Sequence, residues 1–342
     1  MFSNNFLWMN GKENLQTGFV AVGQNSVFDP YNANIITTSP DGITWTTRSV
    51  TGSLSEQGTY LTSVAWSSSL GTWVASGTHR PGFPGNYQKM WTSPNGTIWT
   101  PRDIPTMAPL PYALSTKSVV WVPELSKFIA GGNLTSSLGY SFLTSTDGIT
   151  WTPSGGKTEA NYDVTAIAYS PTLGKTFGVW SSGNPGEYSS NLSSWLGISG
   201  SQNNLYAIIW VSELSRFITV GDGTQAGYST NGTSFVTATA AENGTWRGLA
   251  WSPTLSRAVA VGRTGTKRAM YSSDGATWSN VSVTGASTQA WNAVTWSPEL
   301  SKFIAVGDGG WTMSSSDGIT WTQTPSSISF TLTAVNRGLI SA

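Results

Sequence analysis

A short motif, Ser-x-Asp-Gly-x-Thr-Trp, returns along the chain and constrains what this chain can fold into. Its copies, some with Asn for Asp and one with Leu for Gly, begin at Ser39, Ser93, Ser145, Ser189, Ser229, Ser272 and Ser315. Asp-Gly between two short β-runs is a strong hairpin signal, because Gly adopts positive φ freely and Asp or Asn tolerates it. Each copy therefore predicts a strand, a two-residue type I′ turn, and a second strand that begins at the apolar Trp.

A second motif alternates with the first and predicts another pair of strands. An apolar triplet ends in an aromatic residue, as in Val294-Thr295-Trp296, and a turn such as Ser297–Lys302 follows it. A second apolar run then closes on Gly307, 11 residues after the aromatic residue, and four other copies share this spacing. Each repeat thus contains four short strands, and no helical periodicity competes with them.

Four antiparallel strands in a unit that recurs every 40–54 residues indicate a β-propeller. We predict one all-β domain over residues 1–342, a seven-bladed β-propeller of four-stranded antiparallel blades, with repeats at about 17–50, 60–104, 116–153, 163–197, 205–238, 246–281 and 291–322. A ring has to close, or its end blades expose strand edges. The segment 330–336 resembles a first strand without a partner, so we expect it to pair in the first blade; the alternative places Phe6–Met9 there.

The charge balance and the missing residue types exclude several classes of protein. The chain has 17 basic and 17 acidic residues, which argues against nucleic acid as a partner. Its apolar runs are strand-sized, so no membrane insertion is expected, and its first residues lack the pattern of a secretory signal. With no Cys and a single His, thiolate chemistry and ordinary zinc sites are excluded, and we predict no cofactor and no metal-ligand set. Calcium held by loop carboxylates and carbonyl oxygens stays an open alternative.

The repeated motif resembles the Asp-box of the sialidase-like, or BNR-repeat, propellers, and this resemblance spans about residues 17–322. The usual box has one residue between Asp and Gly, so the copies in this chain are a shortened variant. In that family the box is a peripheral structural turn, which implies a role in the fold for this motif. Copies such as Ser39-Pro40-Asp41-Gly42-Ile43-Thr44-Trp45 are most similar to repeats of bacteriophage virion-associated propellers. At the level of the fold alone, this implies a viral structural protein.

One face of such a propeller carries the repeated turns, and the other carries loops that vary between repeats. Loops on a rigid scaffold often bind ligands, so we take the variable face as the candidate binding face. Aromatic, polar and charged side chains that suit a sugar ring are expected there; the candidates are Trp246, Trp291, Trp311, Tyr206, Tyr87, His79, Arg80, Asp222 and Asp308. For Trp246 and Trp291 the competing interpretation is packing between blades, and for Asp222 and Asp308 it is turn capping.

The sequence contains no complete catalytic set. A sialidase needs an arginine cluster and a Tyr–Glu nucleophile pair, and the arginines of this chain are scattered. A triad would have to use His79, the only His. We therefore predict no catalytic residues and a non-enzymatic, virion-associated structural or receptor-binding propeller, whose partners are other virion proteins or cell-surface glycans. The alternatives are a free carbohydrate-binding lectin, cytoplasmic or extracellular, and a glycoside hydrolase that uses Asp222 or Asp308.

Overall fold

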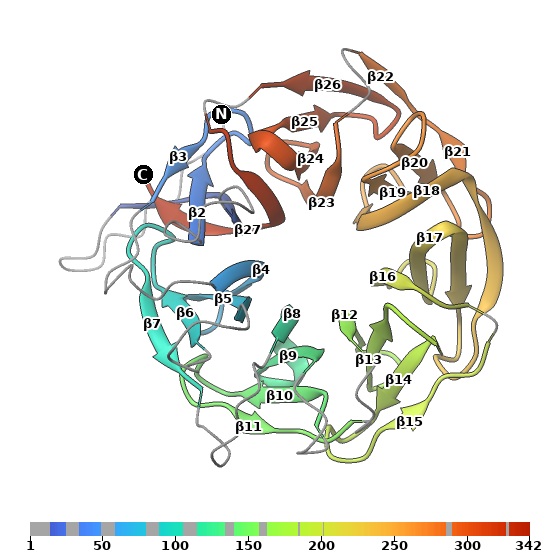
Figure 1. The fold of residues 1–342 in the computed structure, drawn as a ribbon, viewed down its shortest axis with the longest axis horizontal. Coiled ribbons are helices and arrows are strands. Elements are labelled where there is room, and N and C mark those ends of the chain that lie inside the picture. The colour runs from blue at the N-terminus through green and yellow to red at the C-terminus, as the bar shows by residue number, and fades with distance from the viewer. Residues whose placement is uncertain are drawn as a thin grey trace.

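The computed structural model describes residues 14–24, 34–48, 59–79, 89–104, 115–133, 140–156, 163–183, 185–200, 202–284, 289–325 and 328–342. They form a closed ring of β-sheets, and the chain runs once around the ring (Figure 1). Apart from two 3-10 turns, η1 (Pro123–Leu125) and η2 (Asp308–Gly310), every element is a strand. The predicted all-β propeller is therefore confirmed. Within the part of the chain described, no helix has the length and apolar character to cross a membrane.

The strands pair into five hydrogen-bonded sheets. The sheet that joins the two ends of the chain, called the closing sheet below, contains β27 (Thr331–Ser341), β1 (Leu15–Gln24), β2 (Asn34–Ser39) and β3 (Thr46–Thr47). The next contains β4 (Thr59–Ser67), β5 (Thr72–His79), β6 (Lys89–Ser93), β7 (Thr100–Asp103), β8 (Ser115–Val122), β9 (Lys127–Asn133), β10 (Phe142–Ser145) and β11 (Thr152–Pro153).

The other three sheets follow in chain order around the ring. The third contains β12 (Val164–Ser170), β13 (Lys175–Trp180), β14 (Gly186–Ser189) and β15 (Leu196–Gly197). The fourth contains β16 (Leu205–Val211), β17 (Arg216–Ser229), β18 (Val236–Ser252), β19 (Arg257–Gly262), β20 (Ala269–Ser272) and β21 (Ser279–Asn280). The fifth contains β23 (Trp291–Ser297), β24 (Lys302–Gly307), β25 (Thr312–Ser315), β26 (Thr320–Thr324) and β22 (Ser282–Thr284), which pairs in parallel with β26.

The prediction of seven four-stranded blades needs correction in its count. Six blades are each built from four consecutive strand segments of one repeat. The first repeat supplies only β1, β2 and β3, so it forms no blade of its own and shares its sheet with β27. Sheets also merge, because β5 pairs with β8 at Thr78 and Ser115 and because β17 and β18 are long enough to serve in two positions each.

The two ends of the chain close the ring, as the C-terminal segment predicts. β27 pairs antiparallel with β1 from Leu15↔Ser341 to Gln24↔Thr331. The strand is longer than the expected segment 330–336, and its inner position is the one that the alternative gave to Phe6–Met9, residues outside the described part of the chain. The structure thus pairs the most distant parts of the sequence within one sheet.

The repeated turn has a different geometry from the expected type I′ hairpin. Gly42 has a φ of 75°, but Asp41 is not among the residues with positive φ. The Oδ1 atom of Asp41 instead accepts hydrogen bonds from the backbone N–H of Ile43 (2.8 Å) and Thr44 (2.7 Å), and Gly42 N–H donates to Ser39 Oγ (2.8 Å). A side-chain acceptor thus organises a longer turn, and Asn can replace Asp because its Oδ1 accepts the same bonds.

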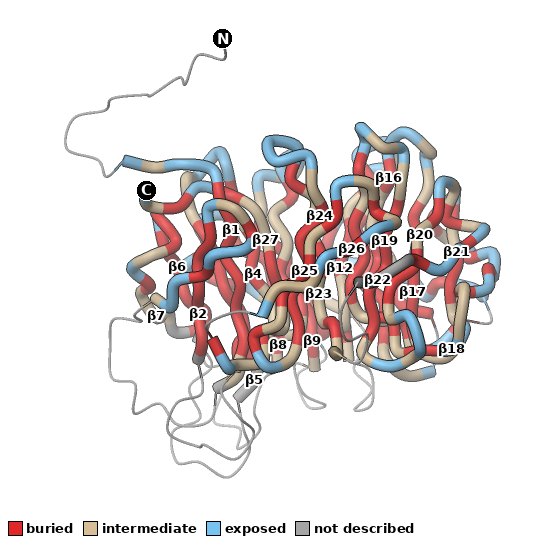
Figure 2. Tube along the Cα trace, turned by 90° about the horizontal axis from the view of Figure 1, so that it is seen from above, coloured by how far each residue is buried: buried red, intermediate tan, exposed pale blue. Residues whose placement is uncertain are grey.

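The core lies between neighbouring sheets, where, for example, Val20 and Val22 of β1 pack with Trp73 of β5. Figure 2 shows buried residues along the strands all around the ring. The turn glycine takes part in this packing, since a Cβ on Gly148 would lie 2.7 Å from Val74 Cγ2 of the preceding blade. The Trp that ends the motif is buried in most copies, as Trp99, Trp151 and Trp321 show. The motif therefore joins each blade to its neighbour, in keeping with the structural role that the sequence predicts for it.

Candidate binding channel

Every innermost strand of the ring has a β-bulge near its start. The register with the next strand shifts by one residue at each of these places, for example between Leu61 and Ser63 and between Trp246 and Gly248. A bulge leaves its extra residue out of the ladder and redirects that side chain. The bulge residues are Thr62, Lys117, Thr165, Tyr206, Arg247, Asn292 and Thr333.

All these bulge residues, together with Arg263, line one cavity of about 300 Å³. This cavity is enclosed by the innermost strands and is called the channel below. The volume is at the lower end of the range of small-molecule sites. The bulge residues lie one to three positions after the first residue of their strands, except that Arg247 lies within the long strand β18. The backbone of this position repeats around the ring while its side chain changes, which makes it a suitable place for a specific site.

Two of the candidate residues stand one position before the residue that lines the cavity. Trp246 and Trp291, the residues just before the bulges, are 0% and 1% exposed and lie within the core between blades. Their rings are closed to a ligand in the channel, so the packing interpretation holds for both. Side chains alternate between the faces of a strand, and the bulge changes that alternation. Arg247 and Asn292 therefore face the channel.

A second set of side chains follows the strand next to the innermost one. Asp222, Arg263 and Asp308 each lie 16 positions after a bulge residue, namely Tyr206, Arg247 and Asn292. Asp222 and Asp308 thus occupy corresponding positions, and each contacts a lining residue of the cavity, Tyr206 or Asn292. Of the corresponding pairs elsewhere, Thr165 and Ser181 are uncharged, whereas Lys117 and Asn133 carry one positive charge. Apart from Lys117, the charged residues of these pairs lie on one arc of the ring, from β17 to η2.

Four bulge side chains hydrogen-bond to the next innermost strand around the ring. The Oγ1 atoms of Thr62, Thr165 and Thr333 donate to the carbonyl oxygens of Thr116 (2.6 Å), Leu205 (2.6 Å) and Leu61 (2.7 Å). Asn292 Nδ2 donates to Leu332 O in the same way, at 2.8 Å. Each acceptor is the residue just before the next bulge. We call these four contacts the bulge latches. The bulge residues without a latch are Lys117, Tyr206 and Arg247.

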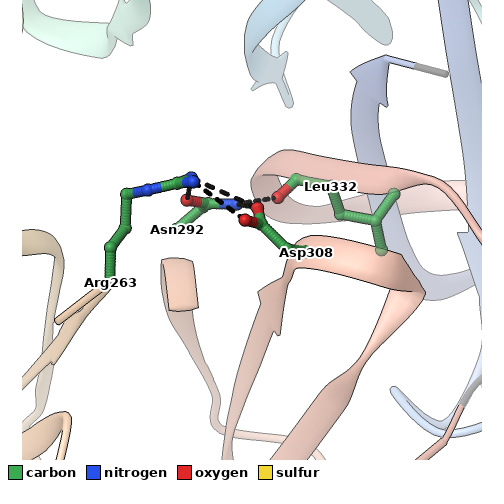
Figure 3. Close-up of polar contacts among 4 residues, drawn as sticks. All are labelled: Arg263, Asn292, Asp308 and Leu332. Carbon is green, nitrogen blue, oxygen red and sulfur yellow. Dashed lines mark hydrogen bonds and ion pairs between the residues drawn. The ribbon is translucent and has the colours of Figure 1, made fainter. Parts of the chain in front are cut away.

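Arg263, Asn292 and Asp308 form a bonded cluster in the channel wall (Figure 3). Arg263 holds both carboxylate oxygens of Asp308, with Nη2 2.8 Å from Oδ2 and Nη1 3.2 Å from Oδ1. Arg263 Nη1 also donates to Asn292 Oδ1 at 2.6 Å, and Asn292 Nδ2 donates to Asp308 Oδ1 at 2.9 Å. About a third of each charged side chain is exposed, so water screens the ion pair. The cluster neutralises Arg263 and Asp308 within the wall.

Arg247 makes a different set of contacts. Its guanidinium carbon lies 3.7 Å from the centre of the Tyr206 ring, a cation–π geometry. Its Nε atom is buried without a hydrogen-bond partner, and no carboxylate of the described residues lies within ion-pair distance. Burial lowers the pKa of Arg247 below its usual range, and the nearby Arg263 adds to this effect, whereas Tyr206 and Asp222 oppose it. The side chain still carries its charge at neutral pH.

Tyr206 and Asp222 complete this second group. Tyr206 Oη lies 3.5 Å from Asp222 Oδ2, and Asp222 Oδ1 accepts a hydrogen bond from Thr245 Oγ1 at 2.9 Å. Burial raises the pKa of Tyr206; the charge of Arg247 opposes this rise and Asp222 adds to it. The phenol is therefore neutral at physiological pH, with a hydroxyl that can donate a hydrogen bond. Tyr206 and Asp222, both predicted from the sequence, thus meet at the channel.

Other candidates lie away from this group. Trp311 is half-buried against the core of the fifth sheet. His79 is the last residue of β5, and the structure describes its backbone position only. Arg80 and Tyr87 lie outside the described residues. Among the residues that are described, no cluster of His, Asp and Glu could hold a metal ion.

Sequence reasoning missed Lys117, Arg247, Arg263, Asn292 and the three latch threonines. The sequence did contain a signal for the bulge residues in 59–297. Each of them stands four positions before the aromatic residue of the second motif, as Arg247 stands before Trp251. No particular residue type marks a bulge in the sequence. Alternation alone therefore could not predict which of these side chains face the cavity.

No protein-family model and no curated protein matches this chain. Solved structures do match its fold. A structure of streptogramin B lyase aligns over 90% of this chain and 87% of its own, with a TM-score of 0.60 and 10% identity. A GH74 xyloglucanase from Xanthomonas campestris aligns over 91% of this chain with a TM-score of 0.60 and 11% identity, and this chain spans 56% of that enzyme. YCF48 from Cyanidioschyzon merolae gives a TM-score of 0.55 at 13% identity over 85% of this chain. At such identities these likenesses show the fold alone, and they identify the chain as a β-propeller.

Proposed function

We propose that this chain is a non-enzymatic binding propeller that takes a polar group of a cell-surface glycan into its central channel. The observation that carries the proposal is the constant bulge position with its changing side chain, which lines one cavity with hydroxyl, amide, phenol and guanidinium groups. Such groups hydrogen-bond to sugar hydroxyls. The bulge latches fix the backbone around the cavity, and a preorganised site loses less free energy when a ligand binds.

The non-enzymatic part of the proposal is supported by what the channel carboxylates contact. Hydrolysis of a glycoside requires two carboxyl groups with free access to the bond. Asp308 is held by Arg263 and Asn292, and Asp222 by Thr245 and Tyr206. These contacts favour structural and positioning roles for both. Release of reducing sugar from a bound glycan, lost in Asp222→Asn or Asp308→Asn, would contradict this part.

The location in a virion is supported by the similarity of the repeats to those of phage propellers. A free lectin would use the same channel, so binding data alone do not separate the two functions. Mass spectrometry of purified phage particles separates them. The virion proposal predicts peptides of this chain in stoichiometric amounts, and their absence from particles would leave the free lectin as the function.

A glycan array tests the binding itself. Wild-type protein should bind a restricted set of glycans, and Arg247→Met should lose them, because Arg247 supplies the free guanidinium edge of the cavity. Arg216→Met is a matched control, since Arg216 also lies over a tyrosine, Tyr228, at 4.8 Å but does not line the cavity. Equal loss of binding in both variants, each with a folded circular dichroism spectrum, would place the site elsewhere.

A further inference from the structure

Two cations of the cavity, Arg247 and Lys117, have no directly bonded anion among the described residues. The third, Arg263, is neutralised by Asp308 at 2.8 Å. Lys117 has only a longer-range interaction, with Asp163. Burial raises the pKa of Asp163, an effect that Lys117 opposes, and its Oδ1 atom has no hydrogen-bond partner. Neither cation therefore has a carboxylate of the described residues within ion-pair distance, and Asp222 acts on Arg247 only at longer range, as Asp163 does on Lys117.

The two cations come from well-separated strands of the ring. Lys117 belongs to β8 and Arg247 to the second half of β18, with β12 and β16 between them on one side (Figure 1). Both nevertheless line the same cavity, together with hydroxyl groups of Thr62, Thr165 and Thr333. A ligand that contacts both must therefore present acceptor oxygens in two directions.

We propose that the cavity binds a phosphate group, held between Arg247 and Lys117. A phosphate is tetrahedral, so it can give two oxygens to the fork of Arg247 while others face Lys117. A carboxylate has only two oxygens, both in one plane, so a carboxylate that pairs with the fork of Arg247 has no further oxygen for Lys117. Stacking on Tyr206 holds the Arg247 guanidinium in place before the ligand arrives, which reduces the entropy lost on binding.

The acidic groups nearby are Asp308, Asp222 and Asp163, and the first two are compatible with this site because each has its own partners. Asp163 acts on Lys117 without a direct contact, and burial favours the neutral form of its carboxyl group. Asp308 is paired with Arg263, and Asp222 is bonded to Thr245 and Tyr206. The absence of two bulge latches also supports the phosphate site. Lys117 and Arg247 both lack a latch, so their side chains are free for the ligand. If the phosphate belongs to a glycan, this inference rests on the proposed function; inorganic phosphate is the other source of the same chemistry.

Isothermal titration calorimetry with inorganic phosphate, glucose 6-phosphate and glucose tests the site. The proposal predicts that at least one phosphate probe binds wild-type protein, and that Arg247→Met and Lys117→Met each weaken it about tenfold or more. Arg216→Met should bind as wild type does. Affinity should also fall as NaCl rises, because both contacts are charged.

The pattern of probes separates this inference from the proposed function. Tighter binding of glucose 6-phosphate than of phosphate supports a phosphorylated glycan. Equal binding of the two supports a site for free phosphate and counts against the glycan function. Binding of glucose alone, unchanged in Arg247→Met and Lys117→Met, overturns the phosphate site and leaves glycan binding intact. No binding of either phosphate probe also overturns the phosphate site.

Discussion

At the scale of single residues, the repeated motif stabilises the fold through one side-chain acceptor and one glycine. Asp147 Oδ1 accepts backbone N–H bonds from Ile149 and Thr150 at 2.7 Å each, and Gly148 takes a φ of 75° against Val74 of the preceding blade. Neither residue is near the channel. Substitutions there should change stability and leave ligand binding unaffected.

Gly148→Ala should destabilise the protein by about 2–4 kcal/mol. The new Cβ adds the cost of positive φ for an L-residue, about 1–2 kcal/mol, to overpacking against Val74. Gly71→Ala is the matched control, with a φ of 58° and no atom within 4 Å of the new Cβ, so only the first cost applies. Urea unfolding measures both. Equal losses in the two variants would show that the motif glycine does not pack between blades.

The motif aspartates should make stability depend on acid. Burial alone would raise the pKa of Asp41, Asp147, Asp274 and Asp317, but backbone N–H and Ser hydroxyl bonds lower it below 3.8. Because the pKa of these carboxyl groups is lower in the folded state, ionisation of the groups stabilises the fold. This contribution is complete above the unfolded-state pKa of 3.8 and is lost as the pH falls through the folded-state pKa. Melting temperature should therefore fall steeply below about pH 4. Asp147→Asn keeps the acceptor and should show a shallower fall; an identical pH profile would contradict the linkage.

At the scale of elements, the inner strand has two functions that one bulge separates. The residue before the bulge packs in the core, as Leu61, Leu205 and Trp246 do, and the bulge residue faces the channel. Short strands, their pairing and the sheet order follow from the two sequence motifs, because alternation and turn residues specify them. The position of the bulge and the geometry of the turn could not be predicted from these motifs, because both depend on hydrogen bonds that form only in the folded sheet. That is why Asp222, Asp308 and Tyr206 could be predicted at the channel while Trp246 was assigned there in place of Arg247.

Thr62→Val and Thr165→Val should each cost about 1–2 kcal/mol, because Val keeps the shape of Thr and removes the hydroxyl of a bulge latch. Thr62→Ser keeps the hydroxyl and should lose less. The two Thr→Val effects should add, since the latches lie at different seams of the ring. Thermal unfolding of the single and double variants measures this. A double variant as stable as wild type would show that the latches contribute nothing.

At the scale of the whole molecule, closure depends on the last strand. β27 pairs along the full length of β1, and Thr333 also bonds to Val22 and Leu61. Deletion of 331–342 should open the ring, expose the edge of β1 and produce aggregates or domain-swapped oligomers in size-exclusion chromatography. A chain that ends at Ile340 loses only the pair Leu15↔Ser341 of this ladder and should stay monodisperse. A monodisperse, cooperatively melting protein without 331–342 would contradict the role of β27.

The central claim is that the repeats build the scaffold and that function lies in the bulge residues of the channel. Hydrogen–deuterium exchange of backbone amides, with and without a glycan or phosphate probe that binds, tests this directly. The account predicts slower exchange in the ligand complex around residues 205–207, 246–248 and 291–293, with no change in the turns at 39–45 and 315–321. Protection of those repeated turns, with no change at the bulges, would contradict it.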